Sequence, residues 1–131
     1  MRNATRSSRS FVLCFAAALI FSFGCSPSTA PMSDATIARE LLQSMLEQWK
    51  AGESMSELKK RDPPVYMAED LWKNNSKLED YAIEGESEVF GSNIRFQVKL
   101  KCNNRTGKVV EKSVRYLVTT KPALTIVREE G

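Results

Sequence analysis

The sequence predicts an α+β domain in which an N-terminal amphipathic helix, followed by a short second helix, packs on a four-stranded antiparallel meander sheet. Two observations predict this fold. Apolar residues recur every three to four positions between residues 35 and 50, which is the period of a helix with one buried face. From residue 78 onward the period changes to two, which is typical of strands with one buried face. A helix and a sheet of this kind bury their apolar faces by packing on each other.

A segment typical of exported proteins precedes the domain. Residues 1–10 contain three arginines and no acidic residue, and residues 11–25 read FVLCFAAALIFSFGC. A cationic start, an apolar core of about a dozen residues and a small residue at its end describe a secretory signal, whereas a membrane span needs roughly 20 apolar residues. We therefore assign residues 1–24 to a signal peptide, residues 25–33 to a flexible tether rich in Pro and Ser, and residues 34–131 to one domain.

The end of this signal resembles the lipobox of bacterial lipoproteins, in which a cysteine receives acyl chains and becomes the mature N-terminus. Gly24 and Cys25 fit that pattern, whereas Ser22 and Phe23 depart from it. The resemblance implies lipid attachment at Cys25 and a membrane-anchored protein of the cell envelope that faces the periplasm or the cell surface. Ordinary cleavage after Ala30 and an uncleaved signal anchor are the two alternatives.

Removal of the signal changes the charge of the chain. Three of the 19 cationic residues lie in the signal, so 16 remain against 16 acidic residues. A neutral domain has no general electrostatic attraction for nucleic acid, and we expect no such partner. Cys14 leaves with the signal and Cys25 carries the lipid, so Cys102 has no partner for an intramolecular disulfide. Its position on the apolar face of a strand predicts a buried, inert thiol.

Two helices are expected at the start of the domain. Ser33 or Asp34 can cap the first helix, and Gly52 is placed to end it. Its apolar stripe consists of Ile37, Leu41, Leu42, Met45, Leu46 and Trp49. Ser54 and Glu57 have the spacing of a capping box, which predicts a short second helix that ends before the two prolines at 63 and 64.

Residues 65–77 have the least regular pattern. They predict a short strand, then one helical turn opened by Glu69 and Asp70, and then a turn at the two asparagines that follow. We expect the acidic pair to start that helical turn rather than to bind a metal, because no further ligands converge on it in the sequence. Trp72 is expected in the core or at its edge, where it can line a groove.

Four strands are expected after residue 77, with a two-residue turn at Gly91 and Ser92. The predicted pairs on the apolar face are Val89/Ile94, Ile83/Leu100, Tyr81/Cys102, Ile94/Val118, Phe96/Tyr116, Val98/Val114, Cys102/Val110, Leu124/Val118 and Ile126/Tyr116. The opposite face carries Arg95, Lys99, Lys101 and Arg115 together with Glu84, Glu88 and Glu111. Because acids oppose most of these cations, we expect a solvated, mutually paired surface rather than an anion-binding patch.

The order of these elements resembles the cystatin-like and NTF2-like superfamilies. With the DPPV segment at residues 62–65 and the connection from Trp72 to Tyr81, the chain also resembles small exported lipoproteins of bacteria. The resemblance implies a helix laid across a sheet. Protease inhibition is not implied, because the Gln-Val-Lys-Leu segment at residues 97–100 lies in the middle of a strand and lacks the glycine of the cystatin hairpin motif.

Residues suited to catalysis are scarce. The chain has no histidine, which removes the commonest general base and the commonest nitrogen ligand for metals. An NTF2-like active site would have to use Tyr81, Tyr116 and Asp80. Tyr116 opposite Phe96 is more typical of core packing, and Asp80 has the outward phase. We therefore expect no enzyme, no cofactor and no metal site, unless a tyrosine and a carboxylate converge in a cavity.

Two functional hypotheses of different classes remain. The first is a non-catalytic, lipid-anchored module that binds a protein or envelope partner through a sheet edge or through residues 65–77. The second is a carrier that holds a small apolar ligand in a cavity between helix and sheet. The large inward residues Phe96, Tyr116, Leu124 and Ile126 favour the first hypothesis, because they fill the interior.

Overall fold

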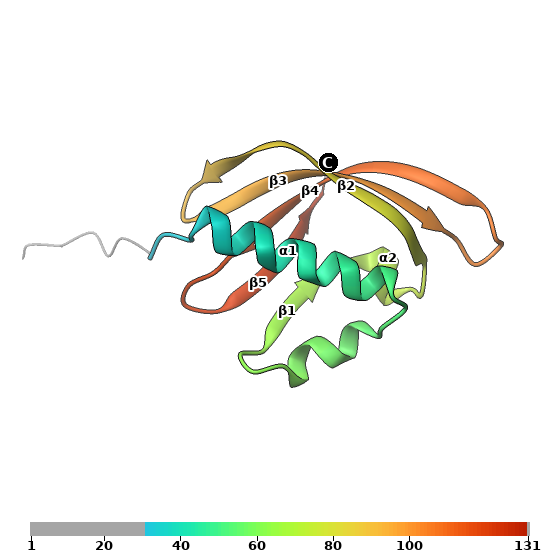
Figure 1. Ribbon diagram of the computed structural model, residues 1–131, viewed down its shortest axis with the longest axis horizontal. Coiled ribbons are helices and arrows are strands. Elements are labelled where there is room, and N and C mark those ends of the chain that lie inside the picture. Colours follow the sequence, from blue (N-terminus) through green and yellow to red (C-terminus); the bar gives the residue numbers. More distant parts are fainter. Residues whose placement is uncertain (1–30, 131) are drawn as a thin grey trace, which may run out of the picture.

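The structure is a computed structural model that describes residues 31–130. The elements are α1 (Ala35–Lys50), the 3₁₀ helix η1 (Met55–Lys60), β1 (Val65–Ala68), α2 (Asp70–Lys73), β2 (Lys77–Phe90), β3 (Asn93–Asn103), β4 (Val109–Thr119) and β5 (Leu124–Glu129). The predicted α+β class is confirmed, and α1 lies under one curved sheet (Figure 1). The predicted signal peptide and the lipid site at Cys25 lie outside the described residues.

The sheet has five strands in the order β1-β5-β4-β3-β2, so the prediction of four strands is wrong by one. The additional strand is β1, which pairs in parallel with β5, while the other pairs are antiparallel. The sequence predicted a short strand here but not its partner, because four residues carry too little periodicity to specify a pairing. The two edges of the sheet are therefore β1 and β2.

The helix α1 begins and ends where the sequence predicts. Asp34 caps its first turn, with the side-chain oxygen accepting the N–H of Ile37 at 2.9 Å, and Gly52 follows its end with a φ of +83°. The predicted apolar stripe is wrong at Ile37, which is 49% exposed, while Ala38 is fully buried. A spacing of four residues advances about 40° beyond a full turn at each step, so Ile37 lies about 120° from Trp49 around the helix.

Residue Ser33 belongs to the domain, although it was predicted to end the tether. Its N–H donates to the carbonyl of Ser92 at 3.0 Å, and its hydroxyl accepts the N–H of Thr120 at 2.9 Å. The N–H of Asp34 donates to the hydroxyl of Thr120 at 3.0 Å. The start of the domain is thus fixed between the β2–β3 turn and the β4–β5 loop.

The predicted register between β3 and β4 is confirmed throughout. The observed partners include Ile94/Val118, Phe96/Tyr116, Val98/Val114, Lys101/Glu111 and Cys102/Val110. The pairing agrees because both strands alternate without interruption, so a single apolar face fixes the register.

The predicted register between β2 and β3 is correct only near the turn, where Val89 pairs with Ile94. Further along, Ile83 pairs with Val98 rather than with Leu100. Tyr81 likewise pairs with Leu100 rather than with Cys102, so both partners are displaced by two residues. The cause is an irregularity between residues 84 and 88, which contains a left-handed glycine and adds residues to β2 alone.

The predicted register between β4 and β5 is displaced by two residues. Ile126 pairs with Val118, and Arg128 pairs with Tyr116, the position predicted for Ile126. Two more residues therefore lie between Val118 and its partner in β5 than the predicted register places there. As a result, a charged residue occupies an inward position beside Tyr116.

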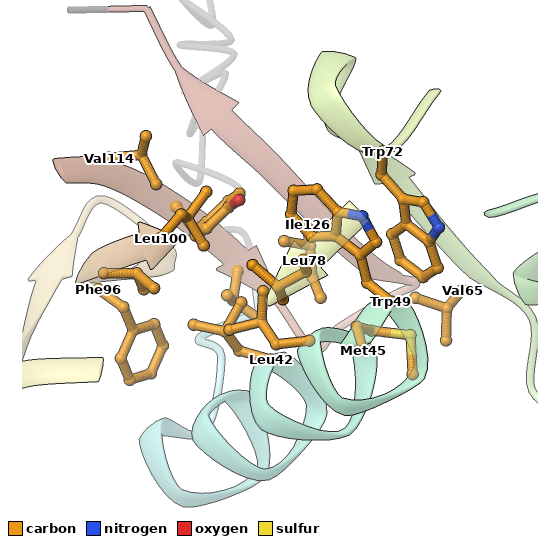
Figure 2. Close-up of a cluster of buried hydrophobic side chains, with 14 of the residues drawn as sticks. Leu42, Met45, Trp49, Val65, Trp72, Leu78, Phe96, Leu100, Val114 and Ile126 are labelled. Atoms are coloured by element: carbon orange, nitrogen blue, oxygen red, sulfur yellow. The ribbon is translucent and has the colours of Figure 1, made fainter. Parts of the chain in front are cut away.

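One apolar cluster joins α1 to the inner face of the sheet. Its fully buried members include Leu42, Met45, Leu46, Trp49, Leu78, Ile94, Val98, Leu100, Tyr116, Val118 and Ile126. Figure 2 shows Leu42 and Met45 of α1 beside Leu78 and Ile126 of the sheet, with the indole of Trp72 near that of Trp49. The space between α1 and the sheet, which the carrier hypothesis requires, is occupied by these side chains.

Candidate functional site

A surface groove of about 780 Å³ lies where the C-terminal end of α1 meets η1, β1 and α2. We call it the β1 groove. It is lined by Trp49, residues 52–56, Lys59, Val65, residues 67–70, Trp72, Lys73 and residues 75–77. Residues 65–77, which the sequence indicated as a candidate binding segment, supply most of this lining.

Two tryptophans build the inner wall of the β1 groove. The rings of Trp49 and Trp72 are stacked, with centroids 5.7 Å apart and planes inclined by 10°. Trp49 Nε1 donates to the carbonyl of Ser76 at 2.8 Å, and Trp72 Nε1 donates to the carbonyl of Glu53 at 2.8 Å. Because both rings are almost completely buried, they hold the segments of the groove together and offer little ring surface to a ligand.

The strand β1 forms one side of the groove and has an open edge. It pairs with β5 on one side only. Among residues 31–130, no backbone hydrogen bond connects residues 65–68 to any element other than β5. Unpaired N–H and C=O groups of an edge strand are able to pair with another chain.

The rim of the groove carries charges of both signs. Lys59, Lys73 and Lys77 lie on it together with Glu53 and Asp70. Within the described residues, neither Lys59 nor Lys73 has an acidic side chain within 4.0 Å. The rim therefore offers ammonium groups and carboxylates without a strong net charge.

A buried polar cluster lies beneath the groove. Glu69 caps α2, because its Oε1 accepts the N–H of Leu71 at 2.9 Å, and this confirms the predicted helix start. The same oxygen accepts a hydrogen bond from Arg128 at 3.0 Å, and Oε2 accepts the hydroxyl of Tyr116. The sequence did not predict this cluster. Glu69 and Arg128 both occupy alternate positions that face the inner side of the sheet. This shared orientation predicts their contact only when β1 is paired with β5.

A tyrosine and a carboxylate thus converge, which was the condition for considering an enzyme. The Tyr116 side chain is fully buried and the Glu69 side chain has no exposed area. Burial, followed by the charge of Glu69, raises the pKa of Tyr116 far above its ordinary value, so the hydroxyl stays protonated. A general acid or base must come within hydrogen-bond distance of its substrate, and this cluster is closed to one.

The other residues considered for catalysis lie elsewhere. The Tyr81 hydroxyl donates to Glu47 at 2.5 Å, and burial together with that bond raises the pKa of Tyr81 to about 12. Asp80 is exposed and lies 3.5 Å from Lys50. The structure therefore gives Tyr81 and Asp80 partners different from those of Tyr116.

Cys102 is buried and free, as its phase predicts. Burial, with a smaller contribution from the charge of Glu69, raises the pKa of its thiol to about 11. A thiol with this pKa is almost entirely protonated at neutral pH and is a poor nucleophile.

Two of the three charge pairs predicted on the outer face of the sheet are ion pairs in the structure, while Lys101 and Glu111 are register partners without an ion pair within 4.0 Å. Arg95 lies 3.4 Å from Glu88, and Lys99 lies 3.5 Å from Glu84. The ion pair with the shortest separation was not predicted. Arg95 donates to both carboxylate oxygens of Glu129, at 2.7 and 2.8 Å.

The described part of the chain contains no group of three or more acidic or cysteine side chains arranged to hold a metal ion. None of its helices is both long and apolar enough to cross a bilayer. The fold and the groove define a small α+β domain with an open sheet edge beside a surface groove. Comparison of the chain with known protein families, with characterised proteins and with solved structures finds no match.

Proposed function

We propose that this protein is a non-catalytic binding module of the bacterial cell envelope, anchored by lipid at Cys25, and that its β1 groove binds an extended segment of a protein partner. A single observation carries the proposal: an edge strand with one unpaired side borders a groove of about 780 Å³. An extended peptide that adds to a sheet edge gains main-chain hydrogen bonds, and an adjacent pocket receives its alternate side chains.

The groove has the composition that such binding requires. Met55 of η1 and Met67 of β1 are half-buried apolar side chains in its lining. Methionine adapts its shape to different partners, so these two residues supply an adaptable apolar surface. Lys59 and Lys73 at the rim supply donors for carbonyl or carboxylate groups of the bound segment.

The anchor at Cys25 rests on the signal-like segment and on its resemblance to a lipobox. A relation to the cystatin-like or NTF2-like superfamilies is part of the same proposal, and α1 beneath a curved sheet supports it. The second candidate function is transport of a small apolar ligand. Because core side chains fill the space between α1 and the sheet, such a ligand would occupy the β1 groove.

Two matched variants test the groove. Ala68 and Ala82 are exposed alanines on β1 and β2, the two opposite edges of the sheet. Ala68 is part of the groove lining, so Ala68→Arg adds a long charged side chain at the edge strand where the segment would bind, and Ala82→Arg adds the same side chain at the opposite edge, outside the lining. Since both positions are exposed, both variants should fold.

The measurement is native mass spectrometry of the wild type and of both variants, taken from their own membranes in mild detergent. We expect a chain that starts at Cys25 and carries acyl groups, with a second polypeptide bound to the wild type and to Ala82→Arg but lost from Ala68→Arg. A small molecule that is bound to the wild type and to Ala82→Arg but lost from Ala68→Arg would favour the carrier function. A partner that stays bound to Ala68→Arg would show that the groove is not its binding site. A chain that starts at Pro31 or Met1 would show that Cys25 is not the lipid anchor.

A further inference from the structure

Exposed apolar side chains gather at the end of the domain where the described chain begins. Met32 is 54% exposed and Ile37 in the first turn of α1 is 49% exposed, while Val89 and Phe90 at the end of β2 are 62% and 46% exposed. Four of the seven large apolar residues exposed in the described part of the chain therefore belong to two adjoining segments. We call this set of four residues the apical patch.

These segments are held together by the hydrogen bonds of Ser33 and Asp34. Ser33 is bonded to Ser92 in the β2–β3 turn, and both residues are bonded to Thr120 in the β4–β5 loop. Figure 1 shows the N-terminal end of α1, the β2–β3 turn and the β4–β5 loop at the same end of the molecule. The apical patch thus belongs to a fixed end of the domain, at which the successive strand residues Val89 and Phe90 point to opposite faces of the sheet.

The covalent chain limits how far this surface can lie from a lipid at Cys25. Met32 follows Cys25 by seven residues, and each residue spans at most about 3.5 Å, so the connection reaches at most about 25 Å. A short connection of this kind gives the attached surface a high effective concentration at the bilayer. The anchor therefore keeps the apical patch within about 25 Å of the lipid at Cys25.

We propose that the apical patch is a membrane-contacting surface, whose apolar side chains enter the interfacial layer of the bilayer beside the lipid of Cys25. This inference rests on the proposed anchor. Aromatic and aliphatic side chains at a protein surface are suited to the boundary between headgroups and acyl chains. The acyl chains of Cys25 hold the domain at the bilayer, and apolar contacts of the apical patch would fix its orientation there.

The charges near the apical patch indicate that contact is apolar rather than electrostatic. Charges of both signs lie in these segments, because Asp34 is bonded to Thr120 and Lys121 follows Thr120 in the chain. Phe90 packs under the guanidinium of Arg95, 3.7 Å from its ring centroid, and Arg95 is in turn paired with Glu129. Polybasic surfaces bind anionic lipids through unpaired cations. We therefore expect contact with neutral lipid to be as strong as contact with anionic lipid.

The proposed orientation also directs the β1 groove away from the membrane. The apical patch lies at the N-terminal end of α1, and Trp49 of the groove lies near its C-terminal end. A helix of 16 residues is about 24 Å long, so the two surfaces are separated by most of the domain. A partner could reach the groove without crossing the lipid surface.

The test uses the full lipid-bearing protein, reconstituted in vesicles, with one added cysteine that carries an environment-sensitive fluorophore. Val89→Cys reports on the apical patch. Val109→Cys is the matched control, since Val109 is 48% exposed and begins β4 beyond the β3–β4 turn. Cys102 is buried, so the added thiol reacts selectively. Both valines are exposed, and neither change removes a core side chain.

We expect the label at position 89 to shift its emission to shorter wavelength and to be quenched several-fold more strongly by lipid-borne quenchers than the label at position 109. Replacing part of the neutral lipid by anionic lipid should leave this difference unchanged. If the protein floats with the vesicles while both labels remain in water, the proposed membrane contact of the apical patch is wrong. The proposed lipid anchor at Cys25 would still hold. Shielding at position 89 without quenching would also overturn the proposed membrane contact, because a second copy or a protein partner would then cover the patch. Protein that does not float would reject the anchor itself.

Discussion

Arg128 and Glu69 form an ion pair beneath the β1 groove in which one partner is completely shielded from water. Arg128 lies 3.0 Å from Glu69 Oε1, and the exposed fractions of the two side chains are 24% and 0%. Glu69 follows β1 and Arg128 belongs to β5, so the pair links the edge strand to the sheet across the only parallel pairing in the described residues. The pair therefore connects the end of β1, which borders the groove, to β5.

The unequal exposure of the two partners predicts unequal costs of removing them. Arg128→Met leaves the buried carboxylate of Glu69 without its cation, so we expect a loss of about 3–5 kcal/mol in the free energy of unfolding. Glu69→Gln leaves Arg128, which still reaches water, and should cost less, about 1–3 kcal/mol. Urea unfolding of the purified protein measures both values. Equal losses would contradict the assignment of Glu69 as the shielded partner.

A second prediction about the same cluster concerns the hydroxyl of Tyr116. Tyr116→Phe keeps the ring in the core but removes the donor to Glu69 Oε2. A buried acceptor without its partner costs about 1–3 kcal/mol, and we expect a destabilisation of that size by urea unfolding. Tyr66→Phe is the control, because Tyr66 is 50% exposed and an exposed substitution changes stability by less than about 0.5 kcal/mol. If Tyr116→Phe is as stable as the control variant, the hydroxyl contributes nothing to the cluster.

Local chemistry made much of this fold predictable from the sequence. The cap at Asp34, the end of α1 at Gly52 and the turn at Gly91 each depend on a few neighbouring residues, and the structure has all three. The register of β3 and β4 was predictable for a different reason. Two long strands with uninterrupted alternation share a single apolar face, which leaves one pairing that buries it.

Features that depend on distant contacts could not be predicted in this way. The parallel pairing of β1 with β5 joins segments about 60 residues apart, and nothing within four residues of strand specifies it. The shift at β5 placed Arg128 where Ile126 was expected, so the partner of Glu69 was missed. The β1 groove combines residues from five elements, and it exists only after those contacts have formed.

The thiol of Cys102 provides a measure of how tightly this part of the core is closed. With a pKa of about 11, roughly one thiol in a thousand is ionised at pH 8, and the side chain is 5% exposed. We expect native protein to react with a thiol reagent orders of magnitude more slowly than unfolded protein. Val109→Cys supplies an exposed thiol in the same fold and should react at once. Fast, stoichiometric labelling of native Cys102 would show that the core opens readily.

The pair formed by Arg95 and Glu129 predicts how stability changes in acid. Hydrogen bonds from Arg95 hold the pKa of Glu129 below its ordinary value of 4.5. The folded state therefore favours the ionised carboxylate, so this contribution is fully present above pH 4.5 and is lost as the pH falls through the lowered pKa. Glu129→Gln removes the contribution at neutral pH and should make the free energy of unfolding fall less steeply below pH 4.5.

Glu88→Gln is the matched control for this measurement. Glu88 also faces Arg95, but its side chain is 65% exposed and the separation is 3.4 Å. A solvated pair contributes little, so the acid limb of this variant should follow that of the wild type. Urea unfolding between pH 3 and pH 7 compares the three proteins. If Glu88→Gln flattens the acid limb as much as Glu129→Gln does, the stabilisation comes from the general field of Arg95 rather than from its two hydrogen bonds to Glu129.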